Sequence, residues 1–405
     1  MRIVISGAGI GGLALALRLR QQRHEVTIFE RTAVPRDIGG GILVPPNSMR
    51  ILHDLGLEEA LADVAVRPEA RQVRRWADGS VIAEAPLGAK VVDVYGAPYM
   101  TMHRADLHRV LLEAAQQELP DLPPIEIHFG REVVDVSTEG DHAAATEASG
   151  EVHEADLVVG ADGLHSRVRR SVGLLDEPTF EGNILWWSLV PMEDVLSDPA
   201  REWAASTLAV WVGPERHVVH FPVRSGRFLM LAAIVPWTEE IPEDWTAVGD
   251  RDAAIEPFES WDSVLSGLMN LTTTVHPWPL LDRNPYDYWS KGRATLLGDA
   301  AHPMLPHQAQ GAAQAVEDTF VLANKLEGIS AADVPAALES YEKGRMRRAT
   351  AIQQASRDHG AAYHLPDGPQ QQERDRVMAQ QSGNAVVSFD WLWGGDPESG
   401  PPESA

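Results

Sequence analysis

Glycine residues recur near the N-terminus of this chain at a spacing that suits phosphate binding. Gly7, Gly9 and Gly12 lie between a short apolar stretch at 2–6 and a helical pattern at 10–22. In this strand, turn and helix setting, the first glycine allows a tight turn, the second lets the backbone approach a pyrophosphate, and the third allows close packing. Free N–H groups at the start of the helix attract phosphates. The predicted dinucleotide-binding residues of this turn are Gly7, Gly9, Ile10, Gly11 and Gly12.

An acidic residue follows at the separation that a ribose contact needs. A second apolar stretch, 25–29, ends at Glu30, eighteen residues after Gly12. A carboxylate at this point can accept hydrogen bonds from ribose hydroxyls. We therefore assign Glu30 and its neighbour Arg31 to the same cofactor site.

A second glycine and aspartate turn, far along the chain, indicates which dinucleotide binds. A buried strand expected at 293–297 delivers Gly298 and Asp299 at its C-terminal end, where ligands lie in open α/β sheets. Asp299 can accept hydrogen bonds from the ribityl hydroxyls of a flavin. Gly311 and Ala312 open a helix whose N–H groups would stabilise negative charge on a reduced flavin by about 0.3 to 2 kcal/mol. The pattern predicts FAD, bound without a cysteinyl link because the chain has no cysteine.

Three motifs in this order resemble those of the class A flavoprotein monooxygenases, the single-component FAD-dependent aromatic hydroxylases. They are the N-terminal glycines, the Asp162-Gly163 segment and the Gly298-Asp299 turn. The resemblance extends from Met1 to about residue 357. Within the family the chain resembles salicylate hydroxylase, 3-hydroxybenzoate 6-hydroxylase and 6-hydroxynicotinate 3-monooxygenase. The local patterns that suggest this group lie at 217–223, 306–311 and 364–369.

The resemblance implies further residues for the cofactor site. The family has an arginine that reaches the flavin from the start of a helix, matched by Arg104, and a glycine-rich strand, matched by Gly41. Its Asp-Gly pair, here Asp162 and Gly163, serves both FAD and the nicotinamide donor, so NADH or NADPH is expected as co-substrate. Many members have glycine where this chain has Ala309, so the resemblance does not determine the backbone conformation of that loop.

The order of the motifs predicts an α/β fold with interleaved domains. We expect a Rossmann-like FAD-binding domain of the glutathione-reductase type, with an inserted antiparallel-sheet substrate domain and C-terminal helices. Residues 391–393 should pack on the body, whereas the stretch from Gly394 should be disordered. The expected boundaries are 1–180 for the first part of the FAD-binding domain, 181–280 for the substrate domain, 281–365 for the second part, and 366–405 for a polar tail.

Charge and composition limit the partners. The chain carries 59 acidic and 34 basic residues, and its net charge of −25 repels nucleic acid and anionic membranes. No apolar stretch is long enough to cross a bilayer. The absence of cysteine suits a reducing cytoplasm. We therefore expect a cytoplasmic monomer or homodimer that acts on a small aromatic substrate with O2.

Two further patterns, a pair of histidines and a group of arginines, are not assigned a binding function. His103 and His108 are five residues apart, which does not bring two ligands onto one helical face, so no metal site is expected. Arg345, Arg347 and Arg348 are interpreted as a solvated helix face rather than a nucleic-acid patch.

The middle of the chain should carry the substrate chemistry. Strands expected at 207–212, 217–223 and 228–235 form an antiparallel meander. Alternation places His217 on one face of this sheet and His220 on the other, so the two histidines cannot both face a bound ring. A phenol reacts better as phenolate, and histidine is the usual base. By analogy with the family, we choose His220 as that base, His307 as the runner-up, and Pro306 for a backbone role beside the flavin.

The resemblance implies a reaction type, and two alternatives stay open beside it. In the family, NAD(P)H reduces the flavin, O2 adds at C4a, and the hydroperoxide hydroxylates a phenolic or heteroaromatic acid. A related flavoenzyme without ring hydroxylation, such as a halogenase or reductase, is the first alternative. A non-catalytic binding protein on the same fold is the second.

Overall fold

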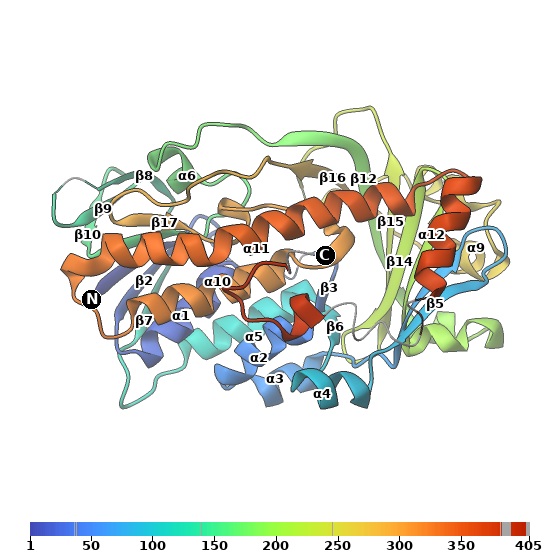
Figure 1. The fold of residues 1–405 in the computed structure, drawn as a ribbon, viewed down its shortest axis with the longest axis horizontal. Helices are drawn as coiled ribbons and strands as arrows, with labels where there is room; N and C mark the ends of the chain where they lie inside the picture. The colour runs from blue at the N-terminus through green and yellow to red at the C-terminus, as the bar shows by residue number, and fades with distance from the viewer. Residues whose placement is uncertain are drawn as a thin grey trace.

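The computed structural model describes residues 1–35, 37, 39–138, 140–244, 246–380, 382 and 390–401. Figure 1 shows two regions side by side, with the parallel sheet at one end, a large antiparallel sheet at the other, and one long helix running across both. The cores of the two regions are formed by different parts of the chain, and these parts alternate along the sequence.

A five-stranded parallel sheet forms the centre of the first region, in the order β17-β11-β1-β2-β7. Its strands are near-continuous apolar runs because helices and a small sheet cover them. The N-terminal strand β1 and the late strand β17, which are remote in sequence, both pair with β11. The bounds are β1 Arg2–Ser6, β2 Glu25–Glu30, β7 Ile125–Phe129, β11 Leu157–Gly160 and β17 Ala294–Leu296.

The helices of this region begin where the glycine motifs predict. The first follows the N-terminal turn, and the tenth follows the second turn and packs on the first. Together they cover one face of the parallel sheet (Figure 1). The bounds are α1 Ile10–Gln21, α2 Pro46–Asp54, α3 Glu58–Val64, α4 Ala89–Tyr95, α5 Arg104–Gln116, α6 Arg167–Ser171, α10 Gly311–Leu326, and the short 3-10 turns η3 Gly298–Ala300 and η4 Pro306–Gln308.

Two small sheets complete the first region. One is a three-stranded antiparallel sheet, and the other is a two-stranded ribbon that leads into α5. The bounds are β8 Val133–Ser137, β9 Ala143–Glu147, β10 Val152–Ala155, β3 Gly41–Val44 and β6 Met100–His103.

The second region is a seven-stranded sheet in the order β16-β12-β15-β14-β13-β4-β5. Its central meander, from β13 to β15, is antiparallel as predicted. The predicted boundary at 181 lies within two residues of the start of β12, but the sheet is not confined to 181–280. Strands β4 and β5 come from the predicted first part of the FAD-binding domain, and β4 pairs with β13 in parallel. The bounds are β4 Ala70–Arg75, β5 Val81–Pro86, β12 Thr179–Pro191, β13 Thr207–Gly213, β14 Arg216–Val223, β15 Phe228–Pro236 and β16 His276–Asp282.

Short helices cover the outer face of this sheet and bury many of its tryptophans. The bounds are α7 Met192–Val195, η1 Pro199–Ala205, α8 Arg251–Ile255, η2 Glu256–Phe258 and α9 Ser263–Asn270.

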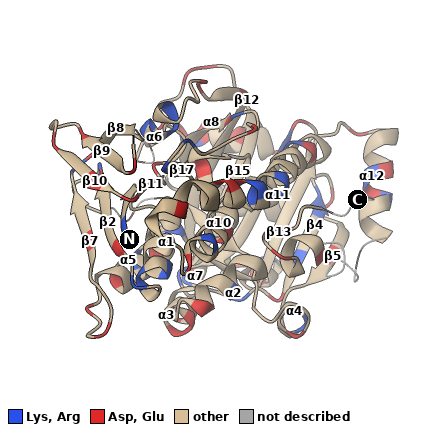
Figure 2. Ribbon diagram, turned by 60° about the vertical axis from the view of Figure 1, so that its left-hand side comes forward, with Lys and Arg blue, Asp and Glu red and all other residues tan. Residues whose placement is uncertain are grey.

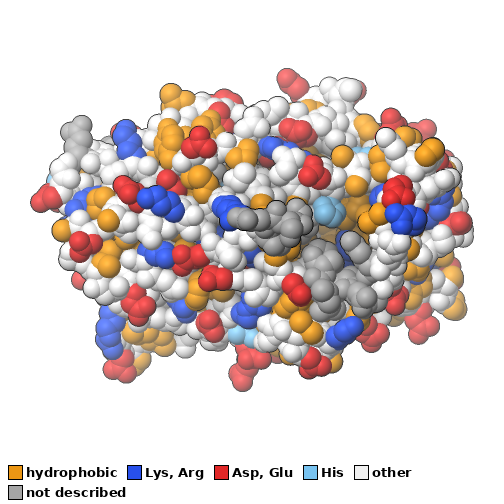
Figure 3. All heavy atoms as spheres, viewed as in Figure 1, with side chains coloured by type: hydrophobic (Ala, Val, Ile, Leu, Met, Phe, Trp, Pro, Cys, Tyr) orange, Lys and Arg blue, Asp and Glu red, His pale blue; other side chains and the backbone are white. Residues whose placement is uncertain are grey.

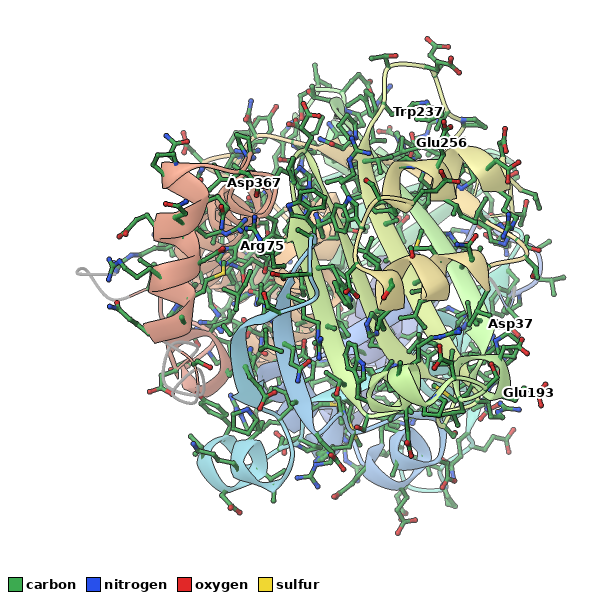
Figure 4. The ribbon with its side chains drawn as sticks, turned by 90° about the vertical axis from the view of Figure 1, so that its right-hand side faces the viewer. Asp37, Arg75, Glu193, Trp237, Glu256 and Asp367 are labelled. Atoms are coloured by element: carbon green, nitrogen blue, oxygen red, sulfur yellow. The ribbon has the colours of Figure 1, made fainter. Side chains whose placement is uncertain are left out.

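The C-terminal part is more ordered than the sequence suggested. After η5 (Ala331–Asp333), the long helix α11 (Val334–Tyr363) crosses the molecule, and α12 (Pro369–Gln380) packs on β5. Asp367, two residues before α12, forms an ion pair with Arg75 of β4 at 3.0 Å. Figure 4 labels both residues. Residues 366–380 are therefore part of the folded body and not a free polar tail.

The last described segment, 390–401, also lies against the body. It contains a π-helical turn, η6 (Asp390–Gly394), whose Leu392 and Trp393 are buried as predicted. The predicted disorder from Gly394 is wrong for residues 394–401, since Glu398 forms an ion pair with Lys325 at 2.7 Å. Residues 402–405 lie outside the described part of the chain.

Of the three arginines predicted to form a solvated face of α11, Arg347 is exposed, but the prediction is wrong for Arg345 and Arg348. Arg345 and Arg348 are fully buried and each donates to Glu317 of α10, at 2.8 and 2.7 Å. Arg348 also donates to the carbonyls of Trp391 and Leu392, which fixes η6 on α11. The acidic side chains are spread over many elements of both regions (Figure 2). Among the described residues, no helix combines the length and apolar character needed to span a membrane.

Candidate active site

A single cavity of about 460 Å³ connects the two regions. The glycine turns at the N-termini of α1 and α10 form one end, and the inner face of the seven-stranded sheet forms the other. Its lining includes these predicted cofactor residues: Gly9, Ile10, Gly11, Gly41, Arg104, Gly163, Gly298, Asp299, Gly311 and Ala312. Segments that are remote in sequence therefore share one space.

The first glycine turn has the geometry of an open cradle. Gly7 has φ +104°, which favours glycine, and a Cβ at Gly12 would lie 2.1 Å from the carbonyl oxygen of Gly7. A Cβ at Gly9, by contrast, would meet nothing within 4 Å, although Gly9 lines the cavity. Gly7 and Gly12 shape the turn, and Gly9 leaves room for a ligand against the backbone.

Besides Gly7 and Gly12, three predicted cofactor residues do not line the cavity. Both oxygens of Glu30 are engaged by backbone, accepting from the N–H of Ala8 at 2.9 Å and of Thr32 at 2.8 Å. Arg31 is exposed. The carboxylate of Asp162 caps α6, where it accepts from the N–H groups of residues 167 and 168. Their contacts with a cofactor stay predictions.

Asp299 and Arg104 place opposite charges beside the cavity. Arg104 is half-buried and Asp299 is exposed, and both line the cavity. Desolvation raises the pKa of Asp299, and the positive charges of His302 and Arg104 oppose this effect. Asp299 is therefore held as an acceptor next to a fixed cation, which suits a polyhydroxyl chain.

The turn at Gly298 is held by a buried carboxylate from α10. Asp318 accepts from the backbone N–H of Gly298 at 2.8 Å and lies 2.7 Å from Nε2 of His302. Gly298 has φ +58°. His302 thus has a structural role within the turn.

The loop between this turn and α10, which contains η4, forms part of the cavity wall. Pro306, His307 and Ala309 all line it. The carbonyl of Pro306 accepts from the N–H of Ala309 at 2.9 Å. Ala309 adopts φ 55° and ψ 36°, the left-handed region, so it takes the conformation for which glycine is favoured.

The inner face of β14 carries His217, not His220. Cross-strand pairing and alternation place His217, Val219 and Phe221 on the cavity side, and all three line it. Our choice of His220 as the base is wrong, since its side chain points to the opposite face of the sheet and does not line the cavity.

His220 lies in a dry, apolar environment. It is 0% exposed, its ring packs against Trp203 and Trp211, and neither ring nitrogen has a hydrogen-bond partner among the described residues. Burial, with the charge of Arg74, lowers the pKa of His220 to about 3. It is a neutral packing residue at physiological pH.

His217 belongs to a cluster of polar side chains at the sheet end of the cavity. Nδ1 of His217 lies 2.7 Å from Nε2 of His364, and its ring centroid is 5.2 Å from that of His307. The ring of Tyr363 packs edge-on against His217, and its hydroxyl accepts from Arg71 at 3.0 Å. Burial lowers the pKa of His307 to about 4 and that of His217 well below 6.5, so both are neutral bases at pH 7.

Comparison with known proteins identifies the cofactor family. The family described as "FAD binding domain" matches residues 1–356. A 3-amino-4-hydroxybenzoate 2-monooxygenase of Streptomyces platensis is 39% identical, over 97% of this chain and 96% of that protein. This chain belongs to the FAD-binding family of flavoprotein aromatic monooxygenases. The resemblance stated from the motifs is confirmed.

Other relatives of this flavoprotein agree. A 6-hydroxynicotinate 3-monooxygenase of Pseudomonas fluorescens is 34% identical, over 88% of this chain and 91% of that protein. The solved structure of a salicylate hydroxylase substrate complex matches with a TM-score of 0.82 and 24% identity, covering 100% of this chain and 99% of that chain. That likeness supports the fold.

Sequence reasoning missed several residues of this flavoprotein's cavity. Arg71 lies on a strand that local patterns assign to the first domain, and Tyr363 and His359 lie at the end of a long helix. Trp393 reaches the cavity from η6. Alternation in β14 placed His217 and His220 on opposite faces correctly, and that was the available signal for His217.

The described part of the flavoprotein brings together one group of potential metal ligands, Glu147, Glu151 and His153, on β9 and β10. Arg131 donates to both carboxylates, with Nε 2.6 Å from Glu147. The negative charge that would attract a cation is thus partly neutralised by Arg131.

Proposed function

We propose that this flavoprotein hydroxylates a small aromatic acid that carries a ring hydroxyl, of the aminohydroxybenzoate or hydroxybenzoate class. The proposal is carried by one observation, a continuous cavity that joins the FAD-motif residues to a wall bearing His217 and Arg71. The relatives' names, which include 3-amino-4-hydroxybenzoate and 6-hydroxynicotinate monooxygenases, support this substrate class.

FAD fits the residues at the first end of the cavity. The open backbone at Gly9 would receive the pyrophosphate, Asp299 would accept from ribityl hydroxyls, and the N-terminus of α10 at Gly311 would face the ring. The chemistry that FAD would supply there is acceptance of a hydride from NADH or NADPH and activation of O2 toward the substrate ring. The protein contributes binding, orientation and the exclusion of water.

His217 would accept the phenolic proton of the substrate. Its imidazole is neutral because burial, His307 and His364 lower its pKa well below 6.5. A neutral imidazole within reach of the hydroxyl raises the electron density of the ring by forming phenolate. His307, in the loop between cofactor and substrate, would orient the same hydroxyl.

Arg71 and Tyr363 would bind the carboxylate of the substrate. Arg71 supplies a positive charge at the sheet end of the cavity, and a guanidinium can bind a carboxylate in a bidentate manner. With a net charge of −25, the protein as a whole repels anions, so an acid needs this local charge.

A cytoplasmic monomer or homodimer is the setting that we propose for this activity. The acidic, cysteine-free composition supports it.

A substrate panel tests the proposal. The acids 3-amino-4-hydroxybenzoate, 3-hydroxybenzoate, salicylate and 6-hydroxynicotinate are compared with 2-aminophenol and phenol, which lack the carboxylate. At least one acid should stimulate NAD(P)H oxidation with formation of a hydroxylated product, and its decarboxylated analogue should not. Hydrogen peroxide without product from every acid would contradict the proposal.

Matched arginine variants test the carboxylate contact. Arg71→Gln should raise the KM for the best acid by about tenfold or more, because a charge-assisted bond is lost. Arg75→Gln removes an arginine from the same face of β4, where it pairs with Asp367 (Figure 4), and should leave the KM unchanged. Equal effects of the two variants would remove Arg71 from the substrate site.

A further inference from the structure

The ring of His217 is connected to a second imidazole on the side away from the cavity lining. Nδ1 of His217 lies 2.7 Å from Nε2 of His364. At this distance one nitrogen donates and the other accepts, so the pair shares one proton. Nε2 of His217 has no hydrogen-bond partner among the described residues, and His217 lines the cavity. Nε2 is thus the nitrogen available to a substrate hydroxyl.

The backbone, rather than the side chains, holds the two rings together. His364 directly follows the last residue of α11, and its carbonyl accepts from the N–H of Glu215 at 3.0 Å. Glu215 lies in the turn that leads into β14, two residues before His217. The end of α11 is therefore fixed next to the base by a contact that does not involve the imidazole of His364.

The two members of the pair differ in exposure. His217 is 1% exposed, whereas His364 is half-buried. In the space-filling view of Figure 3, acidic and basic side chains are spread over the face that α11 crosses. A proton that leaves the cavity through His217 would thus move toward a residue with access to solvent.

We propose that His364 is a positioning residue for His217 and that the pair forms a relay which carries the phenolic proton of the substrate out of the cavity. The inference rests on the proposed function, because it needs a substrate with an ionisable hydroxyl.

The transfer balances without an oxidant or reductant. The substrate O–H bond breaks and Nε2 of His217 takes the proton, while the substrate oxygen keeps the electron pair. Nδ1 of His217 then gives its proton to Nε2 of His364, and Nδ1 of His364 releases one to water. The same path in reverse restores the starting tautomers.

The electrostatic surroundings suit transfer rather than storage of the proton. Burial, with the charge of Arg216, lowers the pKa of His364 to about 4, and the pKa of His217 is also lowered. Both rings are therefore neutral at pH 7, and neither retains an extra proton. The titratable or charged groups that face the pair are His307 from η4, His359 and Tyr363 from α11, Arg71 from β4 and Arg216 from β14.

Ionisation of a coloured phenolic acid tests the relay directly. The holoenzyme is mixed in a stopped-flow instrument with 4-hydroxy-3-nitrobenzoate, whose phenolate absorbs visible light, at a pH below that of its free phenol pKa. In wild type the bound ligand should ionise rapidly. In His364→Ala and His364→Gln this step should slow by about tenfold or more, with the Kd changed less than about twofold. The exposed His142→Gln should behave as wild type.

Chemical rescue separates a relay from a structural role. Added imidazole should restore fast ionisation to His364→Ala and shift the pH profile of that step back toward wild type. Wild-type ionisation rates in both His364 variants would overturn the relay, as would slow ionisation that imidazole does not restore. If wild type ionises the nitrophenol yet hydroxylates no acid of the panel, the proposed function fails while the relay stands.

Discussion

Oδ2 of Asp318 lies 2.7 Å from Nε2 of His302, and the same oxygen accepts from the N–H of Gly298 at 2.8 Å. The other oxygen of Asp318 accepts from Nε of Arg345 at 2.7 Å, and all of these polar groups are buried. One carboxylate on α10 therefore fixes the turn that presents Asp299 to the cavity.

Asp318→Asn should destabilise the protein by about 3 to 5 kcal/mol, because Arg345 then loses one of its buried counter-charges. Urea unfolding of the FAD-free protein measures this change. Glu339→Gln, which removes an exposed partner of Lys343 on α11, is the control and should leave stability unchanged. Equal stability of Asp318→Asn and wild type would show that the buried network adds nothing.

The same carboxylate predicts a response to acid. Burial raises the pKa of Asp318, but His302 and Arg345 outweigh it, so the folded-state pKa is lowered. A lowered pKa gives stability that is complete above the unfolded value, about 3.9, and is lost as the pH falls through the folded value. Stability measured below about pH 4 should thus fall more steeply in wild type than in Asp318→Asn.

Gly9→Ala and Gly12→Ala separate the ligand role of the turn from its folding role. A Cβ at Gly9 meets nothing within 4 Å, so Gly9→Ala should unfold like wild type when free of FAD but bind FAD about tenfold or more weakly. A Cβ at Gly12 would lie 2.1 Å from the Gly7 carbonyl, so Gly12→Ala should lose about 1 to 3 kcal/mol of stability. Titration of the apoprotein with FAD and denaturant unfolding provide the two readouts. Unchanged FAD affinity in Gly9→Ala would place the pyrophosphate elsewhere.

Ala309→Gly should relieve backbone strain beside the cavity. The left-handed conformation of Ala309 costs an L-residue about 1 to 2 kcal/mol, and glycine returns about 0.5 to 1 kcal/mol of this through its greater unfolded-state entropy. Thermal unfolding should show a small net gain, up to about 1 kcal/mol. Ala351→Gly, within α11, is the matched control and should lose about 1 kcal/mol. A loss at residue 309 as large as that of the control would be inconsistent with this account.

His220→Leu should retain hydroxylation, because His220 does not line the cavity. It should also gain stability in acid. The pKa of His220 is about 3 in the folded state, against about 6.5 when unfolded, so wild type loses stability as the pH falls below 6.5. Relative to wild type, the variant should gain about 2 kcal/mol of unfolding free energy between pH 8 and pH 5, as urea unfolding at the two pH values would show. Loss of coupled turnover in a folded variant would return His220 to the list of bases.

Residues close together in the sequence were enough to predict the elements of the FAD-binding region. The glycine turns, the strands that precede them and the helices that follow depend on residues close in sequence, and the structure has each of them within a residue or two of the predicted bounds. Alternation along β14 is equally local, and it placed His217 and His220 on opposite faces correctly.

The tertiary structure decided which face of β14 became the wall of the active site. The loop η4 and the end of α11 cover the His217 face, whereas Trp203 and Trp211 close over His220, and no local pattern distinguishes these two outcomes. The same holds for Arg71, whose strand joins the second sheet by a parallel pairing with β13. Pairing between segments far apart in sequence depends on the packing of the whole chain, so sequence periodicity fixes which side chains lie together but not what they face.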